Sequence, residues 1–435
     1  MSSRTGSANL PLHGGFVPQW LATRMATLGR VIVEAVAHEY GRDEVLVRLA
    51  DPFWFQSFGA VMGMDWHSSG ITTSVIGALR RGLEPVQDEL GLYVCGGRGR
   101  RSRATPAELC AVGDRTGLDG EHLAGTSRLV AKVDNNALQD GYQLYLHGFI
   151  VAADGAWCVV QQGMRPEVRY ARRYHWLSAG LTNFVDAPHA GLDGIPAGEI
   201  LNLTDTRAAL ARDSQLRLLE DEGPDRIVAT LADQQRAQLH LDLPAHHHPR
   251  PADVKLRRLH AALAAAAERG PKDFPDLLVT PGVGPRTIES LALVAEVVYG
   301  APARFSDPAR FSYAHGGKDG FPFPVPLDVY DRTASVLRRA LTEARLGRRE
   351  RLDALARLDR QSLWLEGKVD GPGFAQIVAR EHERLQHMDP RQVGDRPAAA
   401  GSGPRIGSAR AESGRRRKAT AKRGATQSSG QLDLF

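Results

Sequence analysis

Apolar and polar positions repeat with two different periods along the chain, and each period predicts one type of secondary structure. Apolar side chains recur at helical spacing through residues 16–41, ending at Gly41, and again through residues 73–83. A period close to two marks residues 142–164, where two segments rich in Val, Ile, Phe, Tyr and Trp flank Asp154-Gly155. Because Asp-Gly favours the positive φ angles of a tight turn, this stretch predicts a β-hairpin.

A break in the pattern divides the chain. Pro and His replace the periodic pattern in residues 243–255, and a strong helical pattern follows over residues 253–270. We expect an α+β fold, with an N-terminal α/β domain over residues 1–245 whose sheet contains the hairpin, and an all-helical domain over residues 250–388. Residues 389–430, rich in Pro, Gly, Ser, Ala and Arg, predict a disordered basic linker.

Composition limits the setting in which the protein works. Apolar residues make up 42% of the chain and charged residues 24%, which is ordinary for a globular protein. The sequence shows no secretory signal and no membrane-spanning segment, and its three scattered cysteines lack metal-site spacing. We therefore expect a cytoplasmic, nucleoid-associated protein without a membrane partner. The net charge of +5 is consistent with a polyanionic partner. No pattern indicates an oligomeric state.

Residues 277–300, LLVTPGVGPRTIESLALVAEVVYG, resemble the helix-hairpin-helix element of DNA-repair proteins. Glycines in the turn allow a tight bend and bring backbone N–H groups close to a phosphate, and the positive end of the following helix faces the same anion. The alternative is a plain interhelical turn. The predicted DNA-binding residues are Gly282, Val283, Gly284, Arg286, Thr287 and Lys318.

Polar residues gather near the open end of the predicted hairpin. Asp140 enters the first strand, Gln161 and Gln162 interrupt the second, and Lys132 and Asp134 lie just upstream. Carboxylate and amide oxygens are suitable ligands for Mg²⁺ or Mn²⁺. With a lysine nearby, such a metal site suits the hydrolysis of a phosphodiester. The predicted metal ligands are Asp134, Asp140, Gln161 and Gln162. The set resembles restriction-endonuclease-like sites, although the residue order differs from theirs. The alternative is a polar loop beside a capped strand.

Strand alternation makes a further prediction about this hairpin. Alternate residues of the first strand should share a face, with Gln143, Tyr145 and His147 on one face and Tyr142, Leu144 and Leu146 on the other.

A second candidate site follows an apolar, aromatic segment, at Asp65-Trp66-His67-Ser68-Ser69. Asp, His and Ser before a helix suit metal binding, acid–base work or phosphate binding, although the serines also suit a helix N-cap. The predicted catalytic residues are Asp65, His67, Lys132, Asp134, Asp140 and His147. The roles of other histidines stay open: His13, His175, His189, His246, His247 and His248.

A Gly-rich stretch after the helix-hairpin-helix element contains His315, Lys318 and Asp319. A DNA glycosylase would use a single Asp after the second helix of the hairpin, and Asp319 and Asp307 compete for that position.

Several long blocks together resemble a bacterial and archaeal family known as domain of unknown function number 763. The resemblance covers roughly residues 5–345 and rests on these blocks: TGSANLPLHGGFVPQWLATRM, QSFGAVMGMDWHSSGITTSV, LQDGYQLYLH, DGAWCVVQQGM, RRYHWLS and PGVGPRTIESLALVAEVVYGAPARFSDPARFSYAHGGKDGFPFPVP. It implies no established reaction, but it implies that residues 1–345 act as one functional unit, and it agrees with a DNA-directed role.

The peptide Gln431-Leu432-Asp433-Leu434-Phe435 resembles the short motif by which bacterial DNA-processing proteins bind the β sliding clamp. That resemblance implies that the Gln fills a small pocket and the Leu/Phe pair an apolar one. A flexible linker would then raise the local concentration of the protein at DNA.

These features predict a DNA-repair or DNA-processing protein. The leading hypothesis is a divalent-metal-dependent DNA nuclease recruited to the β sliding clamp. The alternatives are a non-catalytic, clamp-associated DNA-binding adaptor and a DNA glycosylase.

Overall fold

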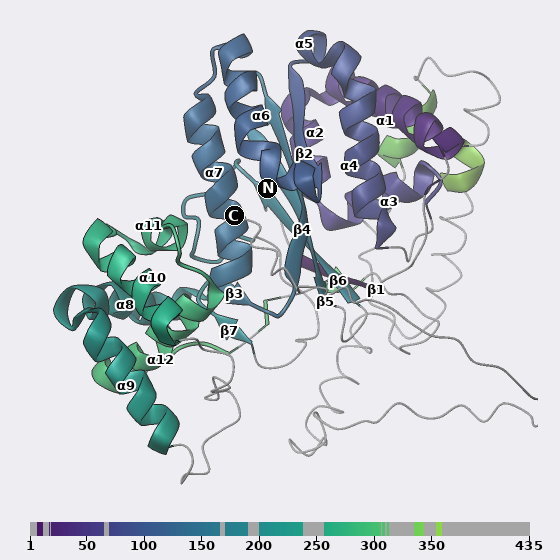
Figure 1. Ribbon diagram of the computed structural model, residues 1–435. Coiled ribbons are helices and arrows are strands. Elements are labelled where there is room, and N and C mark those ends of the chain that lie inside the picture. The colour runs from purple at the N-terminus through teal and green to yellow at the C-terminus, as the bar shows by residue number, and fades with distance from the viewer. Residues whose placement is uncertain are drawn as a thin grey trace, which may run out of the picture. The chain divides into compact units, whose positions relative to one another are not determined.

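A six-stranded sheet with strand order β2-β4-β5-β6-β1-β8 organises the structure (Figure 1). Neighbouring strands are antiparallel except β1 and β8, which are parallel. The strands of this sheet are β1 Ser7–Pro11, β2 Leu92–Arg98, β4 Gln143–Ala152, β5 Trp157–Arg165, β6 Tyr170–Leu177 and β8 Phe311–Ser312. A separate pair consists of β3 Leu138–Gln139 and β7 Leu201–Asn202.

The structure is a computed structural model that describes residues 7–11, 17, 19–64, 69–165, 170–189, 200–237, 256–305, 307–308, 311–312, 335–342 and 354–358. Its labelled helices are α1 Gln19–Tyr40, α2 Arg42–Ala50, α3 Pro52–Val61, α4 Gly70–Leu83, α5 Gln87–Leu90, α6 Arg100–Thr116, α7 Gly120–Lys132, α8 Ala209–Asp221, α9 Gly223–Ala237, α10 Leu256–Arg269, α11 Phe274–Val279 and α12 Pro285–Tyr299. Short helical turns occur at Glu84–Val86 and Thr206–Ala208, and α7 runs into a π-helical turn at Val133–Ala137. None of the described helices has the length and apolar character needed to cross a bilayer.

Helices cover both faces of the sheet, each over its own apolar core. On one face α1 to α4 pack against alternate sheet residues such as Ile150, Cys158 and Val160. On the other face α6 and α7 pack against the intervening residues, among them Phe149 and Val159. Because successive strand residues point to opposite faces, both faces of this sheet are apolar and both are buried. The fold is α+β, as the sequence predicts.

The hairpin predicted around Asp154-Gly155 is present as β4 and β5. Gly155 has a φ of +89°, and the Asp154 carboxylate accepts a hydrogen bond from the amide of Ala156 at 3.0 Å. The helices predicted over residues 16–41, 73–83 and 253–270 correspond to α1, α4 and α10, and α1 ends at Gly41, whose φ is +90°.

The predicted side-chain alternation along the first strand is wrong. The register between β4 and β5 shifts between Leu144 and Leu146, which marks a β-bulge. The extra residue reverses the alternation, so Tyr145 bonds to Gln162 on the α4 side of the sheet, whereas His147 bonds to Gln161 on the α7 side. A bulge moves the following side chains to the opposite face of the sheet but leaves the sequence pattern unchanged. The spacing of apolar and polar residues therefore does not reveal it.

Five helices, α8 to α12, pack together and extend the core beneath α7. Helices α8 and α9 pack against α12, and α9 also packs against α10, although α8 and α9 precede the Pro- and His-rich segment. Leu218, Ile227 and Leu231 fill the interior on the α8 and α9 side. The helical bundle thus begins at Ala209 rather than near residue 250, because the break in sequence pattern does not coincide with a break in packing.

Candidate functional site

Helices α11 and α12 are joined by a tight turn, Thr280 to Gly284. Gly282 lies in the left-handed region with a φ of +84°, which a side chain would disfavour. Gly284 is the extended N-cap of α12, and a Cβ placed there would meet no heavy atom within 4 Å. The turn therefore requires glycine at 282 for backbone conformation. At 284 glycine leaves the start of α12 open to approach.

Two carbonyl oxygens at this turn, those of Val283 and Pro285, face α7 and the segment that follows it. Lys132 Nζ donates to the Val283 oxygen at 3.0 Å, Asn136 Nδ2 donates to the same oxygen at 3.5 Å, and Gln139 Nε2 donates to the Pro285 oxygen at 2.7 Å. Val283 itself is buried. The predicted catalytic residue Lys132 is thus a structural contact of the hairpin turn.

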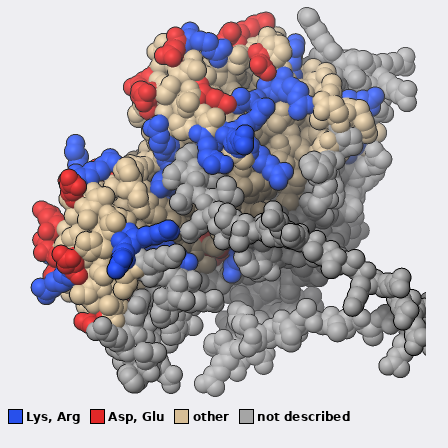
Figure 2. Space-filling view, viewed as in Figure 1, with Lys and Arg blue, Asp and Glu red and all other residues tan. Residues whose placement is uncertain are grey.

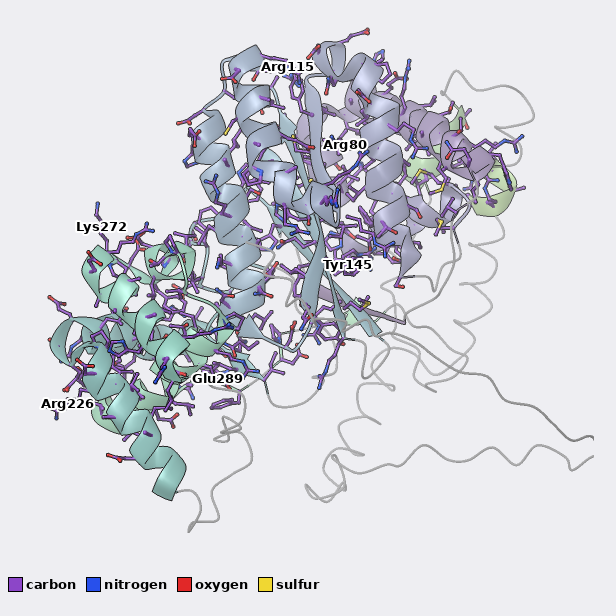
Figure 3. The ribbon with its side chains drawn as sticks, viewed as in Figure 1. Arg80, Arg115, Tyr145, Arg226, Lys272 and Glu289 are labelled. Atoms are coloured by element: carbon purple, nitrogen blue, oxygen red, sulfur yellow. The ribbon has the colours of Figure 1, made fainter. Side chains whose placement is uncertain are left out.

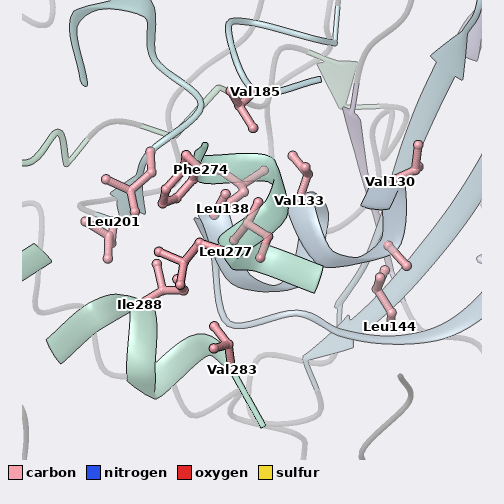
Figure 4. Close-up of a cluster of buried hydrophobic side chains, with 14 of the residues drawn as sticks. Val130, Val133, Leu138, Leu144, Val185, Leu201, Phe274, Leu277, Val283 and Ile288 are labelled. Carbon is pink, nitrogen blue, oxygen red and sulfur yellow. The ribbon is translucent and has the colours of Figure 1, made fainter. Parts of the chain in front are cut away.

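An apolar cluster fixes the same orientation (Figure 4). Phe274 and Leu277 of α11 lie beside Val133 and Leu138, within one core that also includes Ile288. A trans peptide places its carbonyl and its N–H on opposite sides, so the Gly284 amide points away from the side on which Lys132 holds the Val283 carbonyl. Within the part of the chain that the structure describes, the amides of Gly282 and Gly284 donate to no acceptor.

Asp134 lies in the π-helical turn after α7 and is completely buried. Its Oδ2 accepts from Gln161 Nε2 at 2.6 Å and from Trp176 Nε1 at 2.8 Å, and its Oδ1 lies 2.6 Å from His189 Nε2. The predicted proximity of Asp134 and Gln161 is therefore present. Hydrogen-bond donors, however, occupy both carboxylate oxygens.

The network continues from Gln161 into the layer of α7. Gln161 Oε1 lies 2.6 Å from His147 Nδ1, and His147 Nε2 lies 2.9 Å from Ser127 Oγ. Burial lowers the pKa of His147 to about 4, so the ring is neutral near pH 7. With Nδ1 protonated, the donors run in one direction: Ser127 to His147, His147 to Gln161, and Gln161 to Asp134.

This order resembles a serine–histidine–acid relay with an amide inserted. Ser127 and His147 are both buried, with relative exposures of 0% and 1%. A neutral amide lacks the negative charge with which the carboxylate of such a relay stabilises an imidazolium. The chain of hydrogen bonds therefore acts to hold β4, β5 and α7 in register.

Asp140 belongs to a different buried cluster. Its Oδ2 accepts from Arg172 Nη1 at 2.9 Å and from the Tyr174 hydroxyl at 2.6 Å, and its Oδ1 accepts from the amide of Tyr142 at 3.0 Å. Burial raises the pKa of Asp140, while Arg172 and Tyr174 oppose that shift. Burial lowers the pKa of Arg172, but attraction to Asp140 and Asp307 outweighs it and keeps the guanidinium charged.

Gln162 points to the opposite face of the sheet from Gln161, as successive strand residues must. There it bonds to Thr72 and Tyr145, and it donates to the Ser69 carbonyl at 3.0 Å. The four predicted metal ligands are therefore distributed over three separate clusters. Among the described residues, no group of three His, Cys, Asp or Glu side chains is placed to hold a metal ion.

Two of the histidines left open by the sequence lie within these packed layers. His189 contacts Asp134, and His175 Nδ1 lies 3.1 Å from the Leu49 carbonyl oxygen. Burial lowers the pKa of His175 well below its ordinary value. Other predicted residues lie outside the described part of the chain: Asp65, His67, Lys318, Asp319, His13, His315, the run from His246 to His248, and the peptide Gln431, Leu432, Asp433, Leu434 and Phe435.

Residues 6–325 match the family described as a protein of unknown function (DUF763). The chain belongs to this family. No curated protein and no solved structure is significantly similar to it. The family match covers the sheet, both helical layers and the hairpin turn, so the clusters described above all lie within the DUF763 region.

Sequence reasoning missed several residues of this DUF763 region. Arg172, Tyr174 and Trp176 alternate along β6 and all point toward α7, where they bond to Asp140 or Asp134. The segment RRYHWLS could have indicated these three residues, because alternate positions of this strand combine hydrogen-bond donors with aromatic rings. Ser127 gave no such signal, since a serine inside a helical pattern is unremarkable.

Proposed function

We propose that this protein binds the sugar–phosphate backbone of DNA through the turn between α11 and α12, acting as a helix-hairpin-helix element in DNA repair or processing. The observation that carries this proposal is the orientation of the turn. The carbonyls of Val283 and Pro285 accept from Lys132, Asn136 and Gln139, while the amides of Gly282 and Gly284 have no acceptor among the described residues.

The chemistry of the turn suits a phosphate. Amide donors at the start of a helix bind anions, and the positive end of the helix adds to the attraction. Arg286 is exposed one residue after Pro285 and supplies a cation at the same point. Contacts of this kind read the backbone rather than the bases, so we expect binding with little sequence preference.

Gly284→Ala separates the function of the turn from its folding. Position 284 is extended and open, so an added methyl group causes no strain in the protein but obstructs a phosphate approaching the amides. We expect affinity for labelled duplex DNA, measured by fluorescence anisotropy, to fall by about tenfold or more, because hydrogen bonds to a charged group contribute roughly 1.5–3 kcal/mol.

Gly125→Ala is the matched control, since a Cβ at this α7 position also meets nothing within 4 Å. It should leave DNA affinity unchanged. Wild-type protein that shows no salt-dependent DNA binding, or a Gly284→Ala variant that binds as the wild type does, would contradict the proposal.

The metal-dependent nuclease does not fit Asp134 and Asp140 as ligands of one cation. Three donors hold Asp134, and an arginine, a tyrosine and an amide hold Asp140. Nuclease activity stays a prediction, and Asp65 and His67 are its remaining candidates. Incubating the full-length protein with single-stranded and duplex DNA in Mn²⁺ tests it. Cleavage that is lost in EDTA and in His67→Ala would support the enzyme, and intact DNA would favour the adaptor.

Recruitment to the β sliding clamp forms the second part of the proposal. It rests on the sequence of Gln431 to Phe435 and on the basic character of residues 389–430. Clamp binding would place the hairpin turn at DNA, where a tether raises its effective concentration.

A further inference from the structure

The segment that joins β2 to α6 is strongly basic. Arg98, Arg100, Arg101 and Arg103 fall within six consecutive residues, and no Asp or Glu occurs from Gly91 to Ala107. All four arginines are exposed. Like-charged side chains so close together repel one another, so their proximity is unfavourable unless an anionic partner is present.

None of these four arginines forms an ion pair with a described residue. Arg98 stacks over the ring of Tyr145, with its Cζ 5.7 Å from the ring centroid, and that contact leaves its charge uncompensated. Glu108, the nearest acidic residue along α6, already accepts hydrogen bonds from other groups. It accepts from both terminal nitrogens of Arg80, at 2.6 and 2.9 Å, and from the amide of Gly96 at 2.7 Å.

The arginine segment lies at the same edge as the hairpin turn. Helices α6 and α7 are antiparallel neighbours joined by a short loop, since Gly120 packs against Cys110 and Gly113. The start of α6 and the end of α7 therefore lie together, and α7 ends at Lys132, which contacts Val283 of the turn. Figure 2 shows Lys and Arg side chains gathering over the region that Figure 1 labels α4 and α6.

We infer that Arg98, Arg100, Arg101 and Arg103 form a second DNA-backbone surface, which engages the same nucleic acid as the hairpin turn. This inference rests on the proposed DNA binding by α11 and α12. Guanidinium groups are planar, permanently charged donors that match phosphate oxygens, and DNA presents phosphates at regular intervals along one strand. A polyanion extending from the hairpin turn along this edge would meet the arginines next.

The test compares two triple variants with equal charge change. Arg100→Gln, Arg101→Gln and Arg103→Gln neutralise the proposed surface. Arg24→Gln, Arg42→Gln and Arg115→Gln remove the same charge elsewhere: Arg24 and Arg42 are exposed on α1 and α2, and Arg115 lies at the far end of α6 (Figure 3). Circular dichroism and thermal unfolding confirm that both variants fold.

Full-length proteins are titrated with a labelled DNA duplex from low to moderate salt. Each phosphate contact contributes about 0.9 to the slope of log K against log salt, so the slope of the first variant should decrease by about 2 to 3 and its affinity by at least about tenfold. The control should keep the wild-type slope. Equal slopes for both triple variants would overturn the inference.

The two proposals fail separately. If Gly284→Ala weakens DNA binding but the α6 triple variant binds like its control, the hairpin proposal survives and the arginine surface is wrong. Loss of binding in the α6 variant alone would contradict the role of the turn, and with it the shared binding of one nucleic acid by the two surfaces. A wild-type protein that binds no DNA contradicts both.

Discussion

Arg172 donates through Nη1 and Nη2 to both carboxylate oxygens of Asp307, at 2.9 and 2.6 Å, although 135 positions separate the two residues. The same guanidinium donates to Asp140 and stacks over Tyr142 at 4.6 Å. One buried cation thus joins β6, the loop before β4 and the segment after α12. The helical bundle is thereby tied to the sheet on the side that also holds the hairpin turn.

Arg172→Met should destabilise the protein by about 3–5 kcal/mol at pH 7, because it leaves Asp140 and Asp307 buried without their cation. The difference in stability between this variant and the wild type should become smaller as the pH falls. Burial raises the pKa of Asp140, so the folded variant would bind a proton there as the pH falls, and its stability would rise relative to the wild type. Urea unfolding at pH 7 and pH 5 measures both effects.

Arg30→Met breaks the part-exposed Arg30–Glu34 pair and serves as the control, with an expected cost of at most about 1 kcal/mol. An Arg172→Met variant as stable as this control would contradict the assigned role of the cluster.

The long periodic elements of this fold were predictable because each is decided by local pattern. The helix ending at Gly41 and the hairpin around Asp154-Gly155 follow from side-chain spacing and turn chemistry alone. The faces of β4 were not predictable, because the bulge between Leu144 and Leu146 leaves no trace in the spacing of residue types. The extent of the helical bundle was missed for a similar reason, since α8 and α9 join it through long-range contacts.

The candidate site was predicted in part. Asp134 and Gln161 do meet, as the hairpin pattern implied, but Asp140 pairs with Arg172 and Lys132 contacts the hairpin turn. Residue type cannot distinguish these outcomes, because a buried carboxylate suits an arginine as well as a metal ion. Only the partners supplied by β6 and by the segment after α12 decide between them.

Asp134→Asn should cost about 2–3 kcal/mol of stability. The carboxylate accepts from Gln161 and Trp176 and contacts His189, and an amide nitrogen would face one of these donors instead of accepting from it. Chemical unfolding measures the cost. Asp114→Asn, on the exposed surface of α6, should be within about 0.5 kcal/mol of the wild type. Equal stability of the two variants would contradict the buried network.

His147 gives the protein a specific pH dependence. Unfolded histidine binds a proton near pH 6.5, whereas the folded ring has a pKa of about 4, so the unfolded state binds more protons between these values. Stability should fall as the pH drops from about 6.5 to about 4, by at most about 1.4 kcal/mol per pH unit from this group. His147→Leu should show a shallower slope in urea unfolding across that range. His175, whose pKa is also lowered by burial, should leave a residual slope in His147→Leu. Ser127→Ala, which keeps the imidazole, should retain the wild-type slope, and a His147→Leu slope equal to that of the wild type would assign the effect to other groups.

Deleting Gln431 to Phe435 should abolish binding to the β sliding clamp and leave intrinsic DNA affinity unchanged, since the hairpin turn and the arginine surface lie far away in sequence. Surface plasmon resonance with immobilised clamp measures the first effect, and anisotropy with short DNA the second. Deleting Thr426 to Gly430 shortens the same tail by an equal length and should keep clamp binding. A synthetic QLDLF peptide should compete with the full-length protein for the clamp.

Clamp binding that survives the deletion of Gln431 to Phe435 would show that the peptide is not the contact. Loss of DNA affinity on the same deletion would instead mean that the peptide supports DNA binding directly, because a tether acts only when its clamp is present.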